Sequence, residues 1–282
     1  MAKVSIVTDS ASDLPPAHAA AAGITVIPLL VRFGDEEFQA GIELSADAFW
    51  EKMLAPGAPF PTTAAASAGA FKVVFERLFA SGADGIVCVT VGSKLSATHK
   101  SATIAREMLP DRPIEIVDSE TASMGVGLLA LMGAELAAAG ADMATIAETL
   151  RARRQDLDLF VALDTLEYLK RGGRISGARA AMGTILSVKP IITIRDGEVV
   201  QAERVRTRAK ARERVMELFA ERPVERVALL SGPGSDVDSF KAELLARLPD
   251  LDPALVLVET VGPSIGPHIG PGFSGGIVLR RR

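Results

Sequence analysis

The chain has 282 residues, 48% hydrophobic and 23% charged, which fits a globular protein of one large or two modest domains. Its net charge of −4 and pI near 5.6 argue against a nucleic-acid-binding protein. The single cysteine, Cys88, excludes a disulfide framework within the chain. Because no apolar stretch resembles a signal peptide or a membrane span, we expect a cytoplasmic protein without stable membrane insertion.

Short apolar runs alternate with helical patterns along the chain, which is typical of βαβ units and a largely parallel sheet. The apolar runs predict strands at residues 4–8, 24–33, 85–91, 114–118, 159–163, 190–194, 199–206, 227–231, 255–260 and 277–281. The helical patterns predict helices at residues 46–54, 67–80, 96–109, 121–139, 142–156, 207–220 and 235–248. Between two of the strands, Asp196-Gly197 predicts a type I′ hairpin turn.

A cluster of charges at residues 151–158, with the sequence RARRQDLD, separates two apolar segments and marks a domain boundary. We therefore predict an α/β protein with two domains. The N-terminal domain, residues 1–155, has a mostly parallel sheet with flanking helices. The C-terminal domain, residues 156–282, is a smaller α/β domain that contains the hairpin.

Three polar spots lie where a predicted strand ends or a helix begins, which is where α/β sheets bind ligands. Thr62 and Thr63 lead into one helix, and Ser93 and Ser96 lie between a strand and the next helix. The third spot is His268, in the glycine- and proline-rich stretch GPSIGPHIGPGFSGG near the end of the chain. Hydroxyls at helix N-termini either cap free backbone N–H groups or leave those groups to an anion, and both interpretations stay open here.

A basic segment at residues 166–176 carries several cations around a Gly-Gly turn, and Arg174 follows that turn. One interpretation is a solvated helix end whose cations complement the helix dipole. The other is a docking patch for an acidic or phosphorylated partner.

The sequence also matches motifs of other functional classes, but the context that each motif requires is missing. Residues 272–276 match G-x-S-x-G, but a nucleophile elbow needs a following helix and only six residues remain. Residues 125–130 match G-x-G-x-x-A, although the preceding strand ends too early for a dinucleotide-binding turn, so helix packing explains these glycines better. Asp9 and Asp13 could hold a cation, but their pattern is more typical of a turn and helix cap. The three histidines show no ligand spacing, and we expect no metal.

The ordered set of motifs along nearly the whole chain resembles the DegV family of bacterial fatty-acid-binding proteins. The segments that carry the resemblance are, in chain order, TDS at 8–10 with DLP at 13–15, PTT at 61–63, SKLSAT at 93–98, VDS at 117–119, LEYLKRGGRIS at 166–176, VKPI at 188–191, VRTR at 205–208 and HIGPG at 268–272.

This resemblance implies two α/β domains with a long-chain fatty acid bound between or beneath them. It implies that Thr63, Ser96 and His268 bind the carboxylate, with Thr62 and Ser93 as possible supporting residues. It further implies a carrier that is not itself an enzyme and needs no cofactor. Such a carrier presents the acid to a separate fatty-acid kinase, which makes an acyl phosphate for phospholipid synthesis, and we expect Arg174 to help dock that kinase.

The sequence departs from the family pattern at a few positions. Ala64, Ala65 and Ala66 replace the usual Ser-Gln-Pro after the PTT segment, and Ala97 replaces a glycine. Two other hypotheses remain. One is an acyl-ester or thioester hydrolase or transferase that uses Ser96 and His268, and the other is a nucleotide-binding oxidoreductase built on residues 125–130.

Overall fold

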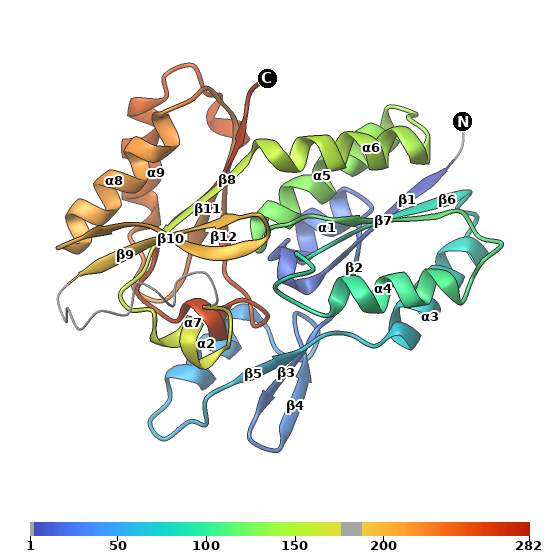
Figure 1. The fold of residues 1–282 in the computed structure, drawn as a ribbon, viewed down its shortest axis with the longest axis horizontal. Helices are drawn as coiled ribbons and strands as arrows, with labels where there is room; N and C mark the ends of the chain where they lie inside the picture. The colour runs from blue at the N-terminus through green and yellow to red at the C-terminus, as the bar shows by residue number, and fades with distance from the viewer. Residues whose placement is uncertain (1–2, 176–187) are drawn as a thin grey trace. The chain divides into compact units, whose positions relative to one another are not determined.

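The computed structural model describes residues 3–175 and 188–282, which form two compact units (Figure 1). The first unit comprises Met1–Gln155 and, far along the chain, Gly262–Ser264. The second unit comprises Asp156–Val261 and Ile265–Arg282. The chain therefore returns to the first unit for three residues before it completes the second.

The first unit is built on a four-stranded parallel sheet with the strand order β2-β1-β6-β7. Its strands are β1 (Val4–Asp9), β2 (Thr25–Ile27), β6 (Gly85–Thr90) and β7 (Ile114–Asp118). All six residues of β6 are buried, as expected for a central strand covered on both faces. The predicted parallel α/β organisation of this part of the chain is confirmed.

Helices cover both faces of this sheet, with α5 and α6 on one side and α3 and α4 on the other (Figure 1). The helices of the first unit are α1 (Pro16–Ala21), α2 (Ala46–Leu54), α3 (Ala68–Ala80), α4 (Thr98–Glu107), α5 (Met124–Ala138) and α6 (Met143–Arg153). Helix α2 begins and ends where the sequence predicts, because Ser45 caps its first turn by accepting from Ala48 N. Its buried side chains are Phe49 and Trp50.

A second, small antiparallel sheet in the first unit has the order β4-β3-β5. It consists of β3 (Leu30–Phe33), β4 (Glu36–Gln39) and β5 (Thr62–Ala64). The prediction of one strand at residues 24–33 is therefore wrong, because the run splits into β2 and β3 in different sheets. Pro28 lies at the break, where its missing N–H and fixed φ interrupt a continuous ladder.

The second unit contains a six-stranded mixed sheet with the order β10-β9-β8-β13-β11-β12. Its strands are β8 (Leu157–Ala162), β9 (Lys189–Arg195), β10 (Glu198–Val205), β11 (Val224–Ser231), β12 (Val256–Thr260) and β13 (Ser274–Arg280). Only β11 and β12 pair in parallel, so the parallel prediction holds for a single strand pair here. The predicted hairpin is confirmed, since Arg195 pairs with Glu198 across Asp196 and Gly197, which both have positive φ.

The helices in the described part of the second unit are α7 (Glu167–Arg171), α8 (Arg208–Ala220), α9 (Val237–Arg247) and α10 (Gly266–Ile269). Helix α8 places Val215, Met216 and Phe219 in the unit's hydrophobic core. Phe219 lies at the centre of that core, between Phe160 of β8 and Phe240 of α9. This core supports the loops that follow the strands, where the basic segment and His268 lie.

Candidate functional site

Ser96 lies in the loop that connects the carboxyl end of β6 to α4. Its Oγ accepts a hydrogen bond from the backbone N–H of Thr98 at 3.3 Å and lies 2.8 Å from Thr98 Oγ1. Thr98 is the first residue of α4, so Ser96 satisfies one of the N–H groups that a helix start leaves free. Ser96 thus accepts from one helix-start N–H, but it precedes the N-cap position, which is Ala97 and has no side-chain cap bond. A hydroxyl offers one donor and two acceptor positions, so this bond still permits a ligand contact.

The Ser96 loop lies at the topological switch point of the parallel sheet. From β1 the chain proceeds to β2 on one side, and β6 lies on the other, so the crevice is outside the carboxyl ends of β1 and β6. Open α/β sheets bind ligands at such crevices. Ser93, a possible supporting residue, is exposed in the same loop, and its backbone N–H donates to Asp118 Oδ1 at 3.0 Å.

Thr63 is the middle residue of β5 and pairs with Val31 of β3. The expectation that this hydroxyl sits at a helix N-terminus is therefore wrong. The N-cap of α3 is Ser67, whose Oγ accepts from Ala70 N at 3.1 Å. Thr62 is exposed one residue earlier in the strand, so the two threonine side chains point to opposite faces.

His268 lies in α10 of the second unit and has a buried Nδ1. Burial, reinforced by the nearby charge of Arg174, lowers the pKa of His268 to about 3. The imidazole is therefore neutral at physiological pH, with one nitrogen as a donor and the other as an acceptor. A neutral histidine of this kind can donate one hydrogen bond to an anion without forming a salt bridge.

Two glycines allow the close packing of α7 against α10 around His268. A Cβ on Gly172 would lie 2.2 Å from His268 Nδ1, and one on Gly270 would lie 2.2 Å from a ring carbon of Tyr168. Gly270 also has a φ of 65°, a left-handed conformation that side chains disfavour. Part of the glycine content of this stretch thus serves the close approach of two helices.

Arg174 follows the Gly-Gly turn and is half-buried. Its Nη1 donates to the carbonyl of Gly172 at 2.5 Å, and burial lowers the pKa of its guanidinium. Lys170 and Arg171, at the end of α7, are exposed and lie in its last turn, as the helix-dipole interpretation predicts. The last residue of the predicted segment, Ser176, lies outside the described part of the chain.

Asp9 and Asp13 follow β1, where the sequence left a cation site or a turn open. All four carboxylate oxygens accept hydrogen bonds, those of Asp9 from Ala11 N and Val91 N and those of Asp13 from Gly262 N and Ser123 Oγ. The turn and cap interpretation is confirmed. In the described ranges, no three His, Cys, Asp or Glu residues gather as a metal site would require.

Asp9 is fully buried at the end of β1. Burial raises the pKa of its carboxyl to about 6, although the hydrogen bonds from Val91 and Ala11 act in the opposite direction. The sequence did not predict the bond to Val91, because Val91 is 82 positions away in the chain.

The glycines at residues 125–130 lie inside α5. A Cβ on Gly125 would come within 2.7 Å of the Thr121 side chain, and one on Gly127 would lie 3.0 Å from Ser12 O. Close packing therefore requires these glycines, as the packing interpretation predicts. The first turn of α5 is buried against its own unit, which does not favour a dinucleotide at this position.

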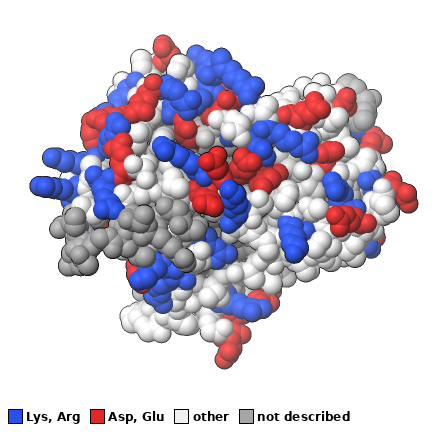
Figure 2. All heavy atoms as spheres, in the orientation of Figure 1, with Lys and Arg blue, Asp and Glu red and all other residues white. Residues whose placement is uncertain are grey.

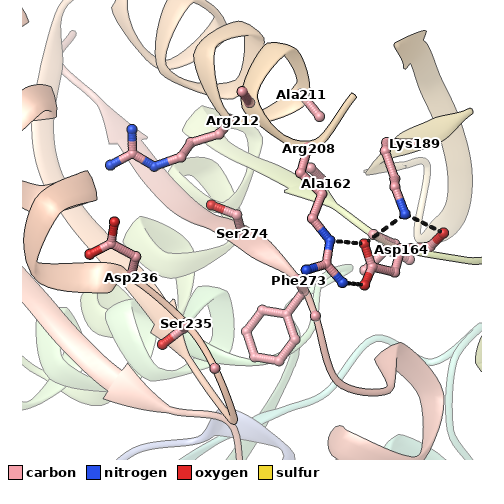
Figure 3. A pocket seen from close by; sticks show the side chains of 14 residues that line it. Ala162, Asp164, Lys189, Arg208, Ala211, Arg212, Ser235, Asp236, Phe273 and Ser274 are labelled. Carbon is pink, nitrogen blue, oxygen red and sulfur yellow. Dashed lines mark hydrogen bonds and ion pairs between the residues drawn. The ribbon is translucent and has the colours of Figure 1, made fainter. Parts of the chain in front are cut away.

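Ser274 of the G-x-S-x-G match is the first residue of β13 and borders a pocket of about 180 Å³ in the second unit (Figure 3). A strand continues after it instead of a helix, so the match is not a nucleophile elbow. Asp164 in the same pocket accepts hydrogen bonds from Arg208 and from Lys189. Burial opposes its ionisation, but these cations prevail and lower the pKa of the Asp164 carboxyl.

Cations and anions are interspersed on the face of the molecule drawn in Figure 2. This distribution differs from the continuous basic surface that nucleic-acid-binding proteins present. Among the residues that the structure describes, none of the helices combines the length and apolar character that crossing a bilayer requires.

Comparison with solved structures identifies the same fold over the whole length of this chain. A DegV family protein from Thermus thermophilus, whose description names fatty acid binding, covers 99% of this chain with a TM-score of 0.89 and 34% identity. DegV of Bacillus subtilis, described as a fatty acid binding protein, covers 100% with a TM-score of 0.89 and 30% identity. This chain covers 100% of each of those proteins.

Sequence comparisons agree with the structural ones. A DegV domain-containing protein of Streptomyces coelicolor is 37% identical over 283 residues, which is 99% of each chain. Another, from Deinococcus radiodurans, is 36% identical over 252 residues, which is 88% of each chain. Residues 3–281 match the family described as "Uncharacterised protein, DegV family". The chain therefore belongs to the DegV family.

Proposed function

We propose that this protein binds a long-chain fatty acid and that Thr63, Ser96 and His268 contact its carboxylate. The observation that carries the proposal is the match, over nearly the whole chain, to solved DegV proteins described as fatty-acid-binding. A solved protein from Eubacterium ventriosum, described as stearic-acid-binding, adds support with a TM-score of 0.87 and 27% identity. None of these descriptions names a reaction, which fits a binding protein.

The chemistry of the three side chains suits a carboxylate that must be both bound and released. Two hydroxyls and a neutral imidazole donate hydrogen bonds without a full positive charge. Most of the affinity then comes from the acyl chain, because about fifteen buried methylenes at ~0.8 kcal/mol each contribute on the order of 12 kcal/mol before association costs. The head group orients the ligand, and the tail holds it.

The low pKa of His268 argues against the hydrolase or transferase alternative. A general base works best when its pKa is near the operating pH, and an imidazole with a pKa of about 3 is a poor base. The Oγ of Ser96 contacts Thr98, the first residue of α4. We therefore expect no hydrolysis of acyl thioesters or nitrophenyl esters, and turnover that is lost in Ser96→Ala would overturn this expectation.

We further infer that the bound acid is presented to a separate fatty-acid kinase, which phosphorylates the carboxylate for phospholipid synthesis. Arg174 is the proposed docking residue. Because its guanidinium also contacts Gly172 O, the charge reversal Arg174→Glu needs two measurements. A docking role predicts slower acyl-phosphate formation with unchanged lipid content, whereas loss of lipid would assign Arg174 to the support of His268.

The binding proposal is tested by mass spectrometry of protein purified from bacteria and by reloading of delipidated protein with palmitate. We expect a co-purifying long-chain acid and stoichiometric reloading. The double variant Thr63→Ala, Ser96→Ala should release palmitate faster. Ser67→Ala, which removes only the cap of α3, is the matched control and should retain it. A protein that carries no acid and cannot be loaded would overturn the proposal.

A further inference from the structure

One short turn, Asp9 to Asp13, makes hydrogen bonds to the segments that precede Ser96 and His268 and to the segment that precedes β3, the strand paired with Thr63. The turn follows β1 and contains a short 3-10 helix, Ser10–Ser12. It includes the TDS and DLP motifs that the sequence analysis singled out, and the proposed function gives these motifs no role. All of the bonds described below lie within the first unit.

The first bond reaches the segment of Ser96. Asp9 Oδ2 accepts from the backbone N–H of Val91 at 2.9 Å, while its other oxygen accepts from Ala11 N. Val91 directly follows β6 and precedes the loop that contains Ser96. Asp9 therefore fixes the point at which this loop leaves the sheet.

The second set of bonds reaches the strand opposite Thr63. Ser10 Oγ accepts from the backbone N–H of Leu29 at 2.8 Å. Leu29 immediately precedes β3, in which Val31 pairs with Thr63. Since Leu29 follows Pro28 at the break between β2 and β3, the Ser10 bond supports the position where β3 begins.

The third set of bonds reaches the segment that leads to His268. Ser10 Oγ also lies 2.8 Å from Ser264 Oγ, and Asp13 Oδ1 accepts from Gly262 N at 2.9 Å. The residues Gly262–Ser264 are the short part of the chain that returns to the first unit. Helix α10 begins two residues after Ser264.

The Asp13 bonds are held by unusual backbone conformations. Asp13 has a φ of 50° and Ser123 a φ of 54°, and the Ser123 Oγ donates to Asp13 Oδ2 at 2.5 Å. Non-glycine residues adopt positive φ at an energetic cost, so such residues persist where the surrounding structure enforces them. Both side chains are buried.

Chain length limits how far His268 can lie from the turn. His268 is four residues after Ser264, and four extended residues span at most about 14 Å. Because α10 is helical and rises only about 1.5 Å per residue, the reach is shorter still. A displacement of Ser264 would therefore be transmitted to His268.

We propose that Ser10 and Asp13 are positioning residues for the carboxylate contacts, with Ser10 serving Thr63 and His268 and Asp13 serving His268. The turn links three segments of the first unit that are far apart in the sequence and that precede the proposed contacts or pair with them. This inference rests on the proposed function, because a positioning residue needs a ligand contact to position.

A purely structural role makes a different prediction from a positioning role. Loss of a buried hydrogen bond destabilises any fold, and that effect alone would be independent of the ligand contacts. A positioning residue instead shows energetic coupling to the contact that it positions, which a double-mutant cycle measures.

The experiment uses the delipidated full-length chain loaded with radiolabelled palmitate, and it measures release into excess albumin. We expect Ser264→Ala to accelerate release about fivefold to tenfold, the effect of one lost hydrogen bond. In a His268→Ala background the same change should have an effect within about twofold. Combined with Thr63→Ala, Ser264→Ala should act additively, because Ser264 bonds to Ser10, whereas the bond toward β3 is the separate one from Leu29 N to Ser10.

Ser10→Ala should show coupling to both Thr63→Ala and His268→Ala, since Ser10 bonds to Leu29 and to Ser264. Asp13→Asn keeps an acceptor for Gly262 N and should release palmitate at a near-normal rate. Asp13→Ala removes that acceptor and should release palmitate faster. Ser67→Ala is the control of similar stability cost and should leave release unchanged. Additive cycles for both Ser10 and Ser264 would overturn the proposal.

The imidazole resonances give a measurement that does not depend on palmitate. The chain has three histidines, so each ring can be assigned by substitution. Ser264→Ala should shift the His268 resonances in delipidated protein, and Ser67→Ala should not. Unshifted resonances would contradict the positioning role. If the wild-type protein took up no palmitate, the proposed function would be contradicted. The positioning of His268 would then be decided by the resonance measurement alone.

Discussion

The two units hold their proposed contact residues by different physical means. In the first unit, Asp9 and Ser10 of the turn accept hydrogen bonds from Val91 N, before the Ser96 loop, and from Leu29 N, before the strand paired with Thr63. In the second unit, His268 is held by close packing against Gly172, where even a methyl group would collide.

This difference determines how each unit responds to amino-acid substitutions near its proposed contact residues. A hydrogen bond can be removed one at a time, or kept by a side chain with the same acceptor, so its loss is graded. A close glycine contact has no such intermediate, because the added atom must displace either the backbone or the ring. The turn of the first unit is therefore sensitive to changes in side-chain polarity, and the packing around His268 in the second unit is sensitive to changes in side-chain volume.

Buried charge also differs between the units. Arg280 of the second unit is buried, and it donates to Asp158 and to the carbonyls of Leu218 and Phe219 at the end of α8. The buried Asp9 of the first unit accepts from the backbone N–H groups of Ala11 and Val91. Trp50, the one tryptophan, reports on the first unit, and Tyr168, the one tyrosine, reports on the second.

The largest expected effect comes from Arg280→Met. This change leaves the Asp158 carboxylate and the carbonyls at the end of α8 without a buried partner, so we expect a loss of about 3–5 kcal/mol in the free energy of unfolding. Denaturant titration followed by Tyr168 fluorescence measures it. The exposed neighbour offers a matched control, Arg281→Met, which should change little. Equal effects of the two changes would contradict a structural role for Arg280.

The second prediction concerns pH and the first unit. Because the pKa of Asp9 is about 6 when folded and 3.8 in its ordinary state, its contribution to stability is full below pH 4 and is lost as pH rises through 6. The difference in the free energy of unfolding between wild type and Asp9→Asn should therefore fall by about 3 kcal/mol from pH 3 to pH 7. Trp50 fluorescence follows the transition. A constant difference would show that Asp9 titrates normally.

Gly172→Ala should have an intermediate effect on stability and a marked one on binding. The new methyl group displaces the His268 ring, and overpacking of this kind costs about 1–3 kcal/mol. We expect release of palmitate to accelerate as well. Gly69→Ala in α3 is the control, because its Cβ would meet no atom closer than 3.7 Å. If the two alanine variants retained palmitate equally, the packing would not serve the ligand.

The smallest expected effect is that of Ser274→Ala. Its side chain borders a pocket of the second unit that Asp164 and Arg208 also line (Figure 3). We expect a change below about 0.5 kcal/mol in the free energy of unfolding and unchanged palmitate retention. Marked loss of palmitate would return Ser274 to the list of candidate contacts.

Local signals predicted much of the fold. The bounds of α2 and β7 follow from the sequence, because a serine cap and a short apolar run between turns are local features. The Asp196-Gly197 hairpin is equally local. The split of residues 24–33 and the strand at Thr63 were missed, because both depend on pairing between segments that are distant in sequence.

In the candidate site, too, local features could be predicted from the sequence and long-range contacts could not. Ser96 was predicted from its place before a helix, but the bonds that support the site join residues 82 and 249 positions apart. The hydrophobic pattern of the sequence contains no signal that Asp13 accepts a hydrogen bond from Gly262 N. The assignment of Thr63, Ser96 and His268 to a carboxylate stays a prediction, and its tests are those described above.

The return of Gly262–Ser264 to the first unit has a consequence for synthesis of the chain. Domains generally fold as units, in order, as they leave the ribosome. Here Asp13 and Ser10 meet partners that are made only after nearly all of the second unit. The first unit can thus form its sheet early, but it can close its turn only when translation is almost complete. The nascent protein would then gain its full set of proposed carboxylate contacts last.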